Sequence, residues 1–370
     1  MGVLGAGQLG RMLALAGYPL GHTFRFYDTA PPESLPPAAQ LAPYVNGRFD
    51  DLAALDAFAA GCDVVTYEFE NVPVGAAMHM AESRPVYPPP RALEVSQDRM
   101  AEKALFASLG IPTPRFAPVD SVDDLASAIA KTGLPAVLKT RRLGYDGKGQ
   151  AVVRGVPEAA AAAARLGGCN LILESLVAFE RELSAIATRG RDGTTVIYPI
   201  CENTHHEGIL RCTLAPSPGA SSAAAEQAHR HVAAILDHLD YVGTLAVEFF
   251  DTGDGLLANE MAPRVHNTGH WTIEGCRTSQ FENHIRAVTG LPLGSVEPLG
   301  HCAMVNIIGR APAADDMLRL GAKVHLYGKE PRPGRKIGHA TIVASSASEL
   351  AGPLEALRGL VLAANQGERI

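Results

Sequence analysis

Short apolar runs alternate with helix-like segments near the start of the chain. The pattern predicts strands at Met1–Leu4, Phe24–Tyr27 and Asp63–Tyr67, and a helix at Arg11–Gly17. Strands that alternate with helices in this way predict a parallel, doubly wound sheet. The first strand is short, which leaves open a start further upstream.

The pattern changes after a proline-rich connector at Pro85–Pro90. A helix is expected at Asp98–Leu109, and a glycine-rich loop at Arg141–Gln150. The run Ala159–Ala164 predicts an ordinary helix, because alanine has the highest helix propensity. Further strands are expected at Leu134–Thr140, Ala151–Arg154, Leu171–Leu176, Glu182–Ala187, Val196–Ile200, Leu245–Phe250 and Leu256–Glu260. A helix and short strands are expected from about residue 296.

Composition indicates a globular protein. Of the 370 residues, 47% are hydrophobic and 19% charged, which argues against a disordered chain. The formal net charge of −7 argues against a general nucleic-acid binder but not against a small anionic substrate. The six cysteines contain no C-x-x-C pair, so we expect no zinc site and a reducing, cytoplasmic location. No signal peptide or membrane span is expected.

Gly5, Gly7 and Gly10 have G-x-G-x-x-G spacing between the first strand and the first helix. In this spacing glycines let backbone amides approach an anion at a helix N-terminus. Asp28, at the end of the second strand, stands where a dinucleotide-binding protein would have its ribose-binding acid. Three interpretations stay open: a tight structural turn, a turn that binds a small substrate, and an NAD site.

Lys139 lies near the end of a strand, just before the glycine-rich loop Arg141–Gln150. The loop lacks the P-loop spacing. Glycines permit the positive φ angles that let loop amides fold over phosphates, while the lysine would neutralise them. The alternative is a flexible, solvated hairpin.

Two acids, Glu248 and Glu260, lie on consecutive expected strands. We expect Phe250 to pair with Leu256 across the turn. Glu248 then faces Ala258, with Glu260 one diagonal step away on the same face. Diagonal neighbours are about 7–8 Å apart, close enough to share Mg²⁺, which binds one or two carboxylates plus phosphates. A one-residue change of register would put the acids on opposite faces, and an exposed edge hairpin is the alternative.

A polar cluster follows the second acid, with Arg264, His266 and Asn267 within four residues. Such a group suits a small anion and developing negative charge. His270 and Trp271 are interpreted as packing residues.

Four cations, Lys329, Arg332, Arg335 and Lys336, occur within eight residues on an expected proline- and glycine-containing turn. Arginine offers bidentate contacts and lysine a point charge, so the segment is a candidate phosphate clamp. A solvated charge run is the alternative.

Together these segments resemble the N5-carboxyaminoimidazole ribonucleotide synthetases, the ATP-dependent carboxylases of 5-aminoimidazole ribonucleotide, over nearly the whole chain. The shared motifs are GAGQLGRML at the start, TYEFENV at 66–72, QDRMAEK at 97–103, GYDGKGQ at 144–150, NEMAPRVHNTGHW at 259–271, QFENHIRA at 280–287 and KEPRPGRKIGH at 329–339.

The resemblance implies an α/β ATP-grasp fold and a place in purine biosynthesis. It implies an N-terminal doubly wound (pre-ATP-grasp) domain at 1–95, an ATP-grasp domain at 96–295 with a mobile lid at about 112–172, and a small C-terminal domain at 296–370. It also implies a homodimer that uses ATP and Mg²⁺ and acts on small molecules.

The resemblance further implies roles for individual residues. It assigns nucleotide binding to Arg99, Lys139, Gly144, Tyr145, Asp146, Gly147, Lys148, Gly149, Gln150, Glu174, Ser175, Leu176, Val177, Glu182, His205, Asn259 and Glu260. It assigns contacts with aminoimidazole ribonucleotide to Gln8, Glu68, Tyr145, Asp146, Lys329, Arg332, Arg335 and Lys336. It places the metal on Glu248 and Glu260, and catalysis on Arg264, His266, Asn267 and Lys148, the first three at a bicarbonate site.

The implied reaction has two steps. Bicarbonate attacks the γ-phosphate of ATP to give carboxyphosphate, which then carboxylates the exocyclic amine of the ribonucleotide. The alternatives are another ATP-grasp ligase such as a formate-dependent purine transformylase, an NAD-linked oxidoreductase, and a non-catalytic ATP-binding relative.

Overall fold

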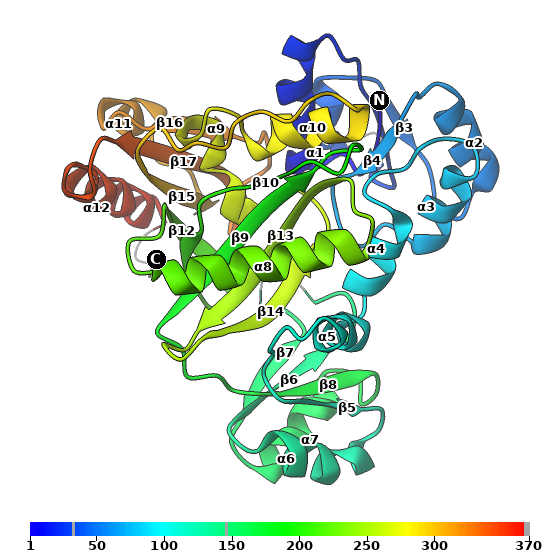
Figure 1. Ribbon diagram of the computed structural model, residues 1–370, viewed down its shortest axis with the longest axis vertical. Helices are drawn as coiled ribbons and strands as arrows, with labels where there is room; N and C mark the ends of the chain where they lie inside the picture. The colour runs from blue at the N-terminus through cyan, green and yellow to red at the C-terminus, as the bar shows by residue number, and fades with distance from the viewer. Residues whose placement is uncertain (32–33, 145–146, 366–370) are drawn as a thin grey trace.

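The computed structural model describes residues 1–31, 34–144 and 147–365. Within these residues the strands form three sheets, and the helices pack around them (Figure 1). The N-terminal part contains β1 (Gly2–Leu4), α1 (Gln8–Gly17), η1 (Tyr18–Leu20), β2 (Arg25–Asp28), η3 (Pro37–Gln40), β3 (Tyr44–Asn46), α2 (Leu52–Ala60), β4 (Val65–Tyr67), α3 (Val74–Ala81) and α4 (Pro90–Ser96).

The N-terminal sheet is parallel, with strand order β3–β2–β1–β4. Successive residues of a strand point to opposite faces, and both faces of this sheet are covered. Val3 joins the core formed with α1 and, further along the chain, α10 (Gln280–Thr289), whereas Leu4 joins the core formed with α2 and α3. The expected doubly wound parallel sheet is therefore confirmed.

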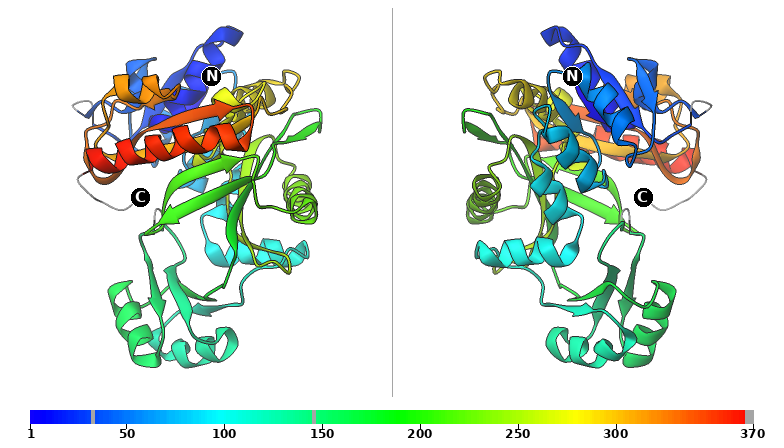
Figure 2. Two further views of the ribbon diagram at one scale, coloured as in Figure 1. Left: turned by 90° about the vertical axis from the view of Figure 1, so that its left-hand side faces the viewer. Right: turned by 90° about the vertical axis from the view of Figure 1, so that its right-hand side faces the viewer.

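A small lobe projects from the rest of the molecule (Figure 2). The segment from 99 to 175 contains α5 (Arg99–Ser108), β5 (Phe116–Val119), η4 (Val122–Asp124), α6 (Leu125–Thr132), β6 (Ala136–Thr140), β7 (Gln150–Val153), α7 (Val156–Arg165) and β8 (Leu171–Ser175). The small lobe, residues 116–175, is an antiparallel sheet of order β5–β8–β6–β7 with α6 and α7 packed against it. The expected alanine helix is α7, and it buries Ala159, Ala162 and Ala163, which share one helix face.

The central sheet forms the body of the molecule and takes its strands from residues 181–262 and 301–344. It contains β9 (Arg181–Arg189), β10 (Thr195–Ile197), β11 (Cys201–His206), β12 (Ile209–Ala215), β13 (Gly243–Asp251), β14 (Leu256–Ala262), β15 (His301–Gly309), β16 (Lys323–Leu326) and β17 (Arg332–Ala344). The strand order is β14–β13–β9–β11–β12–β15–β17–β16, with β10 beside β9. The strands of the C-terminal part therefore continue the sheet that carries the Glu248 and Glu260 strands.

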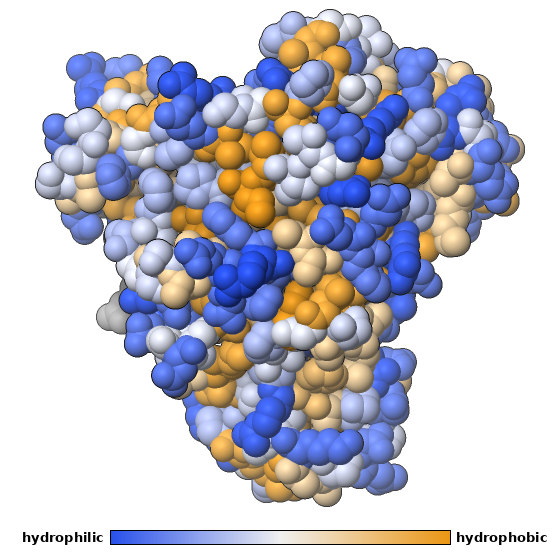
Figure 3. All heavy atoms as spheres, viewed as in Figure 1, coloured by the Kyte–Doolittle hydropathy of each residue, from blue (hydrophilic) through white to orange (hydrophobic). Residues whose placement is uncertain are grey.

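Helices cover this central sheet. They are α8 (Ser222–His238), η5 (Asn267–Gly269), α9 (Thr272–Gly275), α10, α11 (Ala314–Arg319) and α12 (Ala347–Ala364). α8 buries Val232, Ile235 and Leu236 against the sheet and leaves Glu226 and Arg230 exposed, and its outward face carries many hydrophilic residues (Figure 3). Among the described residues, none of the helices has the length and apolar character needed to cross a membrane.

Several expected elements differ from the structure. The expected strand Val196–Ile200 is shorter in the structure, because β10 ends at Ile197, and residues 198–200 connect it to a separate strand, β11, which begins at Cys201. β11 is rich in polar residues and was not expected as a strand; pairing with β9 and β12 satisfies its backbone. The expected connector Pro85–Pro90 leads directly into α4, where proline suits the first helical turn.

Candidate functional site

A cavity of about 760 Å³ opens between the N-terminal part, the small lobe and the central sheet. Its lining brings together residues that are far apart in the sequence. The predicted residues that line it are Gln8, Glu68, Arg99, Gly144, Lys148, Glu248, Glu260, Arg264, His266, Asn267, Lys329, Arg332, Arg335 and Lys336.

Other predicted positions lie elsewhere. Those outside the lining of this cavity are Lys139, Gly147, Gly149, Gln150, Glu174, Ser175, Leu176, Val177, Glu182, His205 and Asn259. The predictions for Tyr145 and Asp146 fall outside the described residues.

Glu248 and Glu260 face each other directly across β13 and β14. The expected register is wrong by one residue, because Leu256 pairs with Asp251 and not with the residue before it. That shift alone would put the acids on opposite faces. A β-bulge after Glu248 takes Asn259 out of the pairing, and this extra residue returns both acids to one face.

The two acids have opposite electrostatic surroundings. Burial raises the pKa of Glu248 to about 7, and the charge of Glu260 adds to this. Burial also disfavours the charged form of Glu260, but the Arg99 guanidinium, 2.9 Å from its Oε2, lowers the pKa of Glu260 to about 2. Two facing carboxylates are a donor set that suits Mg²⁺, because the ion neutralises their repulsion and takes its other ligands from water and phosphates.

Arg264, His266 and Asn267 lie directly after β14. The Arg264 Nε donates a hydrogen bond to Glu70, which orients the guanidinium. The His266 Nδ1 lies 2.9 Å from Thr268 Oγ1. Burial, together with the charge of Arg264, lowers the pKa of His266 to about 3, so the imidazole is neutral at physiological pH. A fixed cation beside a neutral imidazole and an amide can hold a small anion.

The amides of the glycine turn bind carboxylates of the protein itself. Glu68 accepts hydrogen bonds from the amides of Gly7 and Gly10, the second at 2.7 Å. The Asp28 Oδ2 accepts one from the Ala6 amide at 2.9 Å. A Cβ on Gly7 would lie 2.5 Å from the Glu68 Oε1, so the turn makes room for this side chain. A pyrophosphate would have to displace Glu68, which argues against the NAD interpretation.

The basic segment Lys329–Lys336 was expected to be a turn, but most of it belongs to strand β17. The expected turn is therefore too long. β17 begins at Arg332, and Gly309 pairs with Arg332 while Ile308 pairs with Lys336. Residues 333–335 therefore bulge out between two paired positions. The cause is β15, whose backbone extends far enough to pair with this segment.

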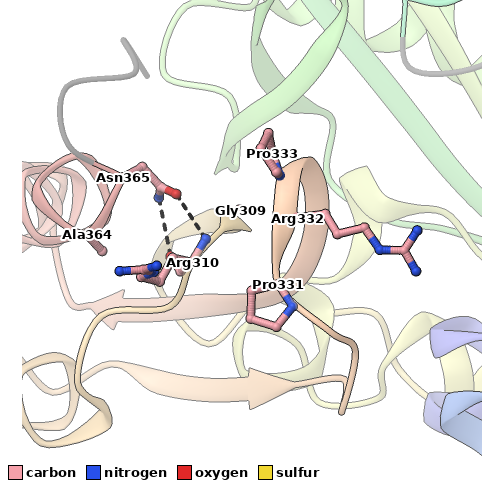
Figure 4. Close-up of a pocket in the computed structure, with 7 residues that line it drawn as sticks. All are labelled: Gly309, Arg310, Pro331, Arg332, Pro333, Ala364 and Asn365. Carbon is pink, nitrogen blue, oxygen red and sulfur yellow. Dashed lines mark hydrogen bonds between the residues drawn. The ribbon is translucent and has the colours of Figure 1, made fainter.

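The basic residues of this segment all border the cavity. They are Lys329, Arg332, Arg335 and Lys336. Arg332 also lines a smaller hollow at the end of α12, but Figure 4 shows its guanidinium directed away from Asn365 and Arg310. The Lys329 Nζ lies 5.9 Å from the centroid of the Tyr327 ring, which is buried.

A buried ion network lies beside the cavity. The Glu174 Oε2 is 3.0 Å from Lys139 Nζ and 3.7 Å from Lys103 Nζ. All three residues are buried. Burial by itself would raise the pKa of Glu174, but the charges of Lys139 and Lys103 lower it. The carboxylate thus holds the two lysines, and its expected part in nucleotide binding stays a prediction.

A hydrogen-bonded pair, Glu182 and His205, joins β9 and β11. The His205 Nδ1 lies 2.8 Å from the Glu182 Oε2. Burial by itself would lower the pKa of His205, but the hydrogen bond to Glu182 and the charge of Glu248 raise it. His270 and Trp271 are buried, as expected of packing residues.

The sequence did not indicate several residues that support the site: Glu70, Lys103, Gln280 and Asn306. Gln280 accepts from the His266 amide at 3.0 Å and donates to the His266 carbonyl at 2.6 Å. Glu70, Lys103 and Gln280 lie inside motifs that carry the family resemblance, which was the available signal. Asn306 lies in no such motif.

Comparisons with known proteins cover nearly the whole chain. Family models match as a ribonucleotide synthetase preATP-grasp domain at residues 1–97, an ATP-grasp domain at 104–281, and a phosphoribosylaminoimidazole carboxylase C-terminal domain at 302–352. The N5-carboxyaminoimidazole ribonucleotide synthase of Pseudomonas aeruginosa is 48% identical over 362 residues, which are 98% of this chain and 99% of that protein.

Solved structures of N5-carboxyaminoimidazole ribonucleotide synthetases also match nearly the whole chain. The N5-carboxyaminoimidazole ribonucleotide synthetase from Thermus thermophilus has 54% identity and a TM-score of 0.92, covering 97% of this chain and 98% of its own. The synthase from Aspergillus clavatus, in complex with ADP and 5-aminoimidazole ribonucleotide, has 32% identity and a TM-score of 0.89, with 97% of each chain covered.

The sheet that carries the facing acids, the small lobe and the basic cavity define an ATP-grasp enzyme. Identity over nearly the full length then fixes the family: the chain belongs to the N5-carboxyaminoimidazole ribonucleotide synthases.

Proposed function

We propose that this protein is a ligase that carboxylates 5-aminoimidazole ribonucleotide with bicarbonate and ATP. The products are N5-carboxyaminoimidazole ribonucleotide, ADP and phosphate, within purine biosynthesis. The observation that carries this proposal is a single cavity lined by three groups of residues. They are the facing acids Glu248 and Glu260, the polar cluster Arg264, His266 and Asn267, and the basic residues at the beginning of β17. Each group suits one part of the reaction: the phosphates, the bicarbonate and the ribonucleotide 5′-phosphate.

In the first step a bicarbonate oxygen attacks the γ-phosphorus, the bond to the β-phosphate oxygen breaks, and ADP leaves. Arg264, His266 and Asn267 hold the bicarbonate. Arg99 and Lys148 balance charge on the phosphates, and positioning with electrostatic stabilisation supplies most of the acceleration. Lys139, presented by Glu174, reaches the same phosphates.

Glu248 and Glu260 would hold Mg²⁺, with the remaining ligands from phosphate oxygens and water. When bound, the ion would neutralise charge on the transferred phosphoryl group. The bulge at Asn259 supports this assignment, because it brings the two carboxylates to face each other.

In the second step the exocyclic amine attacks the carboxyl carbon of carboxyphosphate, the bond from that carbon to the phosphate oxygen breaks, and the amine loses a proton. Gln8 and Glu68 contact the ribonucleotide on the side of α1. Lys329, Arg335 and Lys336 bind its 5′-phosphate, with Arg332 beside them. The small lobe covers the reactants and excludes water, which would hydrolyse carboxyphosphate.

The remaining assignments are also proposals. Residues 174–177 line the adenine, Glu182 binds the ribose, and His205 lies on the nucleotide side. The protein acts as a homodimer in the cytoplasm and is divided at about residues 95 and 295. The free state of all six cysteines is compatible with a reducing compartment.

ADP release from MgATP tests the proposal, measured with and without bicarbonate and the ribonucleotide. We expect release to rise strongly only when both are present. Formate with glycinamide ribonucleotide serves as the matched alternative pair. Stimulation by that pair, with none by bicarbonate and aminoimidazole ribonucleotide, would replace the proposed acceptor by that of a transformylase.

A further inference from the structure

Asn267 is bound at both ends of its side-chain amide by a second asparagine. Its Nδ2 donates to the Asn306 Oδ1 at 3.0 Å, and its Oδ1 accepts from the Asn306 Nδ2 at 2.8 Å. Asn306 belongs to β15, 39 residues further along the chain, and is 1% exposed. Asn267 lines the cavity, whereas Asn306 lies behind it.

A backbone carbonyl determines which way this amide pair points. The Asn306 Nδ2 also donates to the Leu210 carbonyl of β12 at 2.9 Å. If Asn306 were rotated by half a turn, its own oxygen would face that carbonyl, and both bonds to Asn267 would be lost. Oxygen and nitrogen of an amide are assigned from such partners, and here every partner agrees.

The fixed orientation has a chemical consequence at the cavity. The Asn267 Nδ2 carries two hydrogens, and Asn306 accepts one of them. The other is left as a donor, and a donor is what an anion needs from a neighbouring amide. A rotated Asn267 would turn its oxygen towards the anion and break two hydrogen bonds in the protein.

We propose that Asn306 is a positioning residue, which acts through Asn267 by fixing that amide as a hydrogen-bond donor to bicarbonate. The inference rests on the proposed function, because that function places bicarbonate at Asn267. It assigns to the C-terminal part of the chain a share in binding the smallest substrate, through β15, in addition to the phosphate clamp of β17.

The test is Asn306→Ala, with Asn306→Ser as a second, polar variant that is too short to pair with both ends of Asn267; both variants should behave alike. We expect the KM for bicarbonate to rise by about ten-fold or more, as for a lost hydrogen bond to a charged group. The KM values for ATP and the ribonucleotide should stay within about two-fold.

Asn283→Ala is the matched control. Asn283 is buried, and its amide also makes three hydrogen bonds, to the Gly294 amide, the Gly294 carbonyl and the Tyr198 hydroxyl. It lies on α10 outside the cavity lining, so its loss should lower the melting temperature without changing the KM for bicarbonate.

A double variant separates positioning from general damage. In the Asn267→Ala background, Asn306→Ala should not raise the KM for bicarbonate any further, because its effect passes through the missing amide. The inference is overturned if the two effects multiply, or if Asn306→Ala changes all three KM values alike. If the unmodified enzyme shows no bicarbonate-dependent ADP release, the proposed function itself fails, and the inference fails with it.

Discussion

Glu174→Gln should leave two buried lysines, Lys103 and Lys139, without the carboxylate that they share. The Glu174 carboxylate is the shared partner of Lys139 at 3.0 Å and of Lys103 at 3.7 Å. The side chains of Lys103, Glu174 and Lys139 are 0%, 2% and 10% exposed, so solvent can replace little of the lost charge. Glutamine keeps the shape and one acceptor but removes the negative charge.

The expected loss follows from this burial. Removing one partner of a buried ion pair costs about 3–5 kcal/mol, because the other charge is left without compensation. Here two ammonium groups lose the same partner, so we expect the free energy of unfolding at pH 7 to fall by an amount at the upper end, about 5 kcal/mol.

The stability of the Glu174→Gln variant should also change with pH, in a direction that follows from the pKa of Lys103. Burial already lowers the pKa of Lys103, and the charge of Glu174 partly opposes this. Without Glu174 the folded-state pKa falls further, while the unfolded value stays near about 10.4. The folded state then binds fewer protons than the unfolded state between these two values, so the stability of the variant should rise as the pH rises towards about 10.

Urea unfolding at a series of pH values from about 7 to about 10 measures both effects. Glu355→Gln, on the exposed side of α12, is the control and should change stability by less than about 0.5 kcal/mol. A Glu174→Gln protein within about 1 kcal/mol of the unmodified one at pH 7 would refute the reasoning. So would a variant whose stability fell as the pH rose.

Three further predictions concern the cavity. Glu260→Ala should abolish ADP formation and leave the fold intact by circular dichroism; a retained rate would remove this acid from the metal site. Arg335→Ala should raise the KM for the ribonucleotide by about 10- to 150-fold, as for a lost charged hydrogen bond, and that for ATP much less; equal effects would argue against the phosphate clamp. Gly7→Ala should displace the Glu68 carboxylate, 2.5 Å from the new Cβ, and so weaken ribonucleotide binding and lower the melting temperature. The control for Gly7→Ala is Gly75→Ala, at a position outside the cavity lining. There the new Cβ meets nothing within 4 Å, and stability should rise by about 0.4–1 kcal/mol.

The sequence was sufficient to predict strands and hairpins, because their pattern of apolar and polar residues is local. The buried runs around Val3 and Val65 indicated parallel strands, and alternation around Glu248 indicated a hairpin. The bulge at Asn259 could not be predicted, because an extra residue in a strand leaves no mark in composition or period. It decides whether the two acids face each other, so their position on one face of the hairpin was predicted from a register that was wrong.

Contacts between segments that are far apart in the chain could not be predicted from the sequence either. The glycine turn showed that an anion could lie at the N-terminus of α1, but not that Glu68, 61 residues after Gly7, supplies it. The pairing of Asn267 with Asn306 is of the same kind. Tertiary packing also made a strand of the polar segment β11, where intrinsic preference is weak.

Bicarbonate labelled with ¹⁸O tests the central claim most directly, since it follows the atoms of the first step. If a bicarbonate oxygen attacks the γ-phosphorus of ATP, the phosphate released in the presence of aminoimidazole ribonucleotide must carry one oxygen from bicarbonate. The account predicts this transfer, and its loss when Glu260 is replaced by alanine. Unlabelled phosphate, released together with carboxylated product, would contradict it.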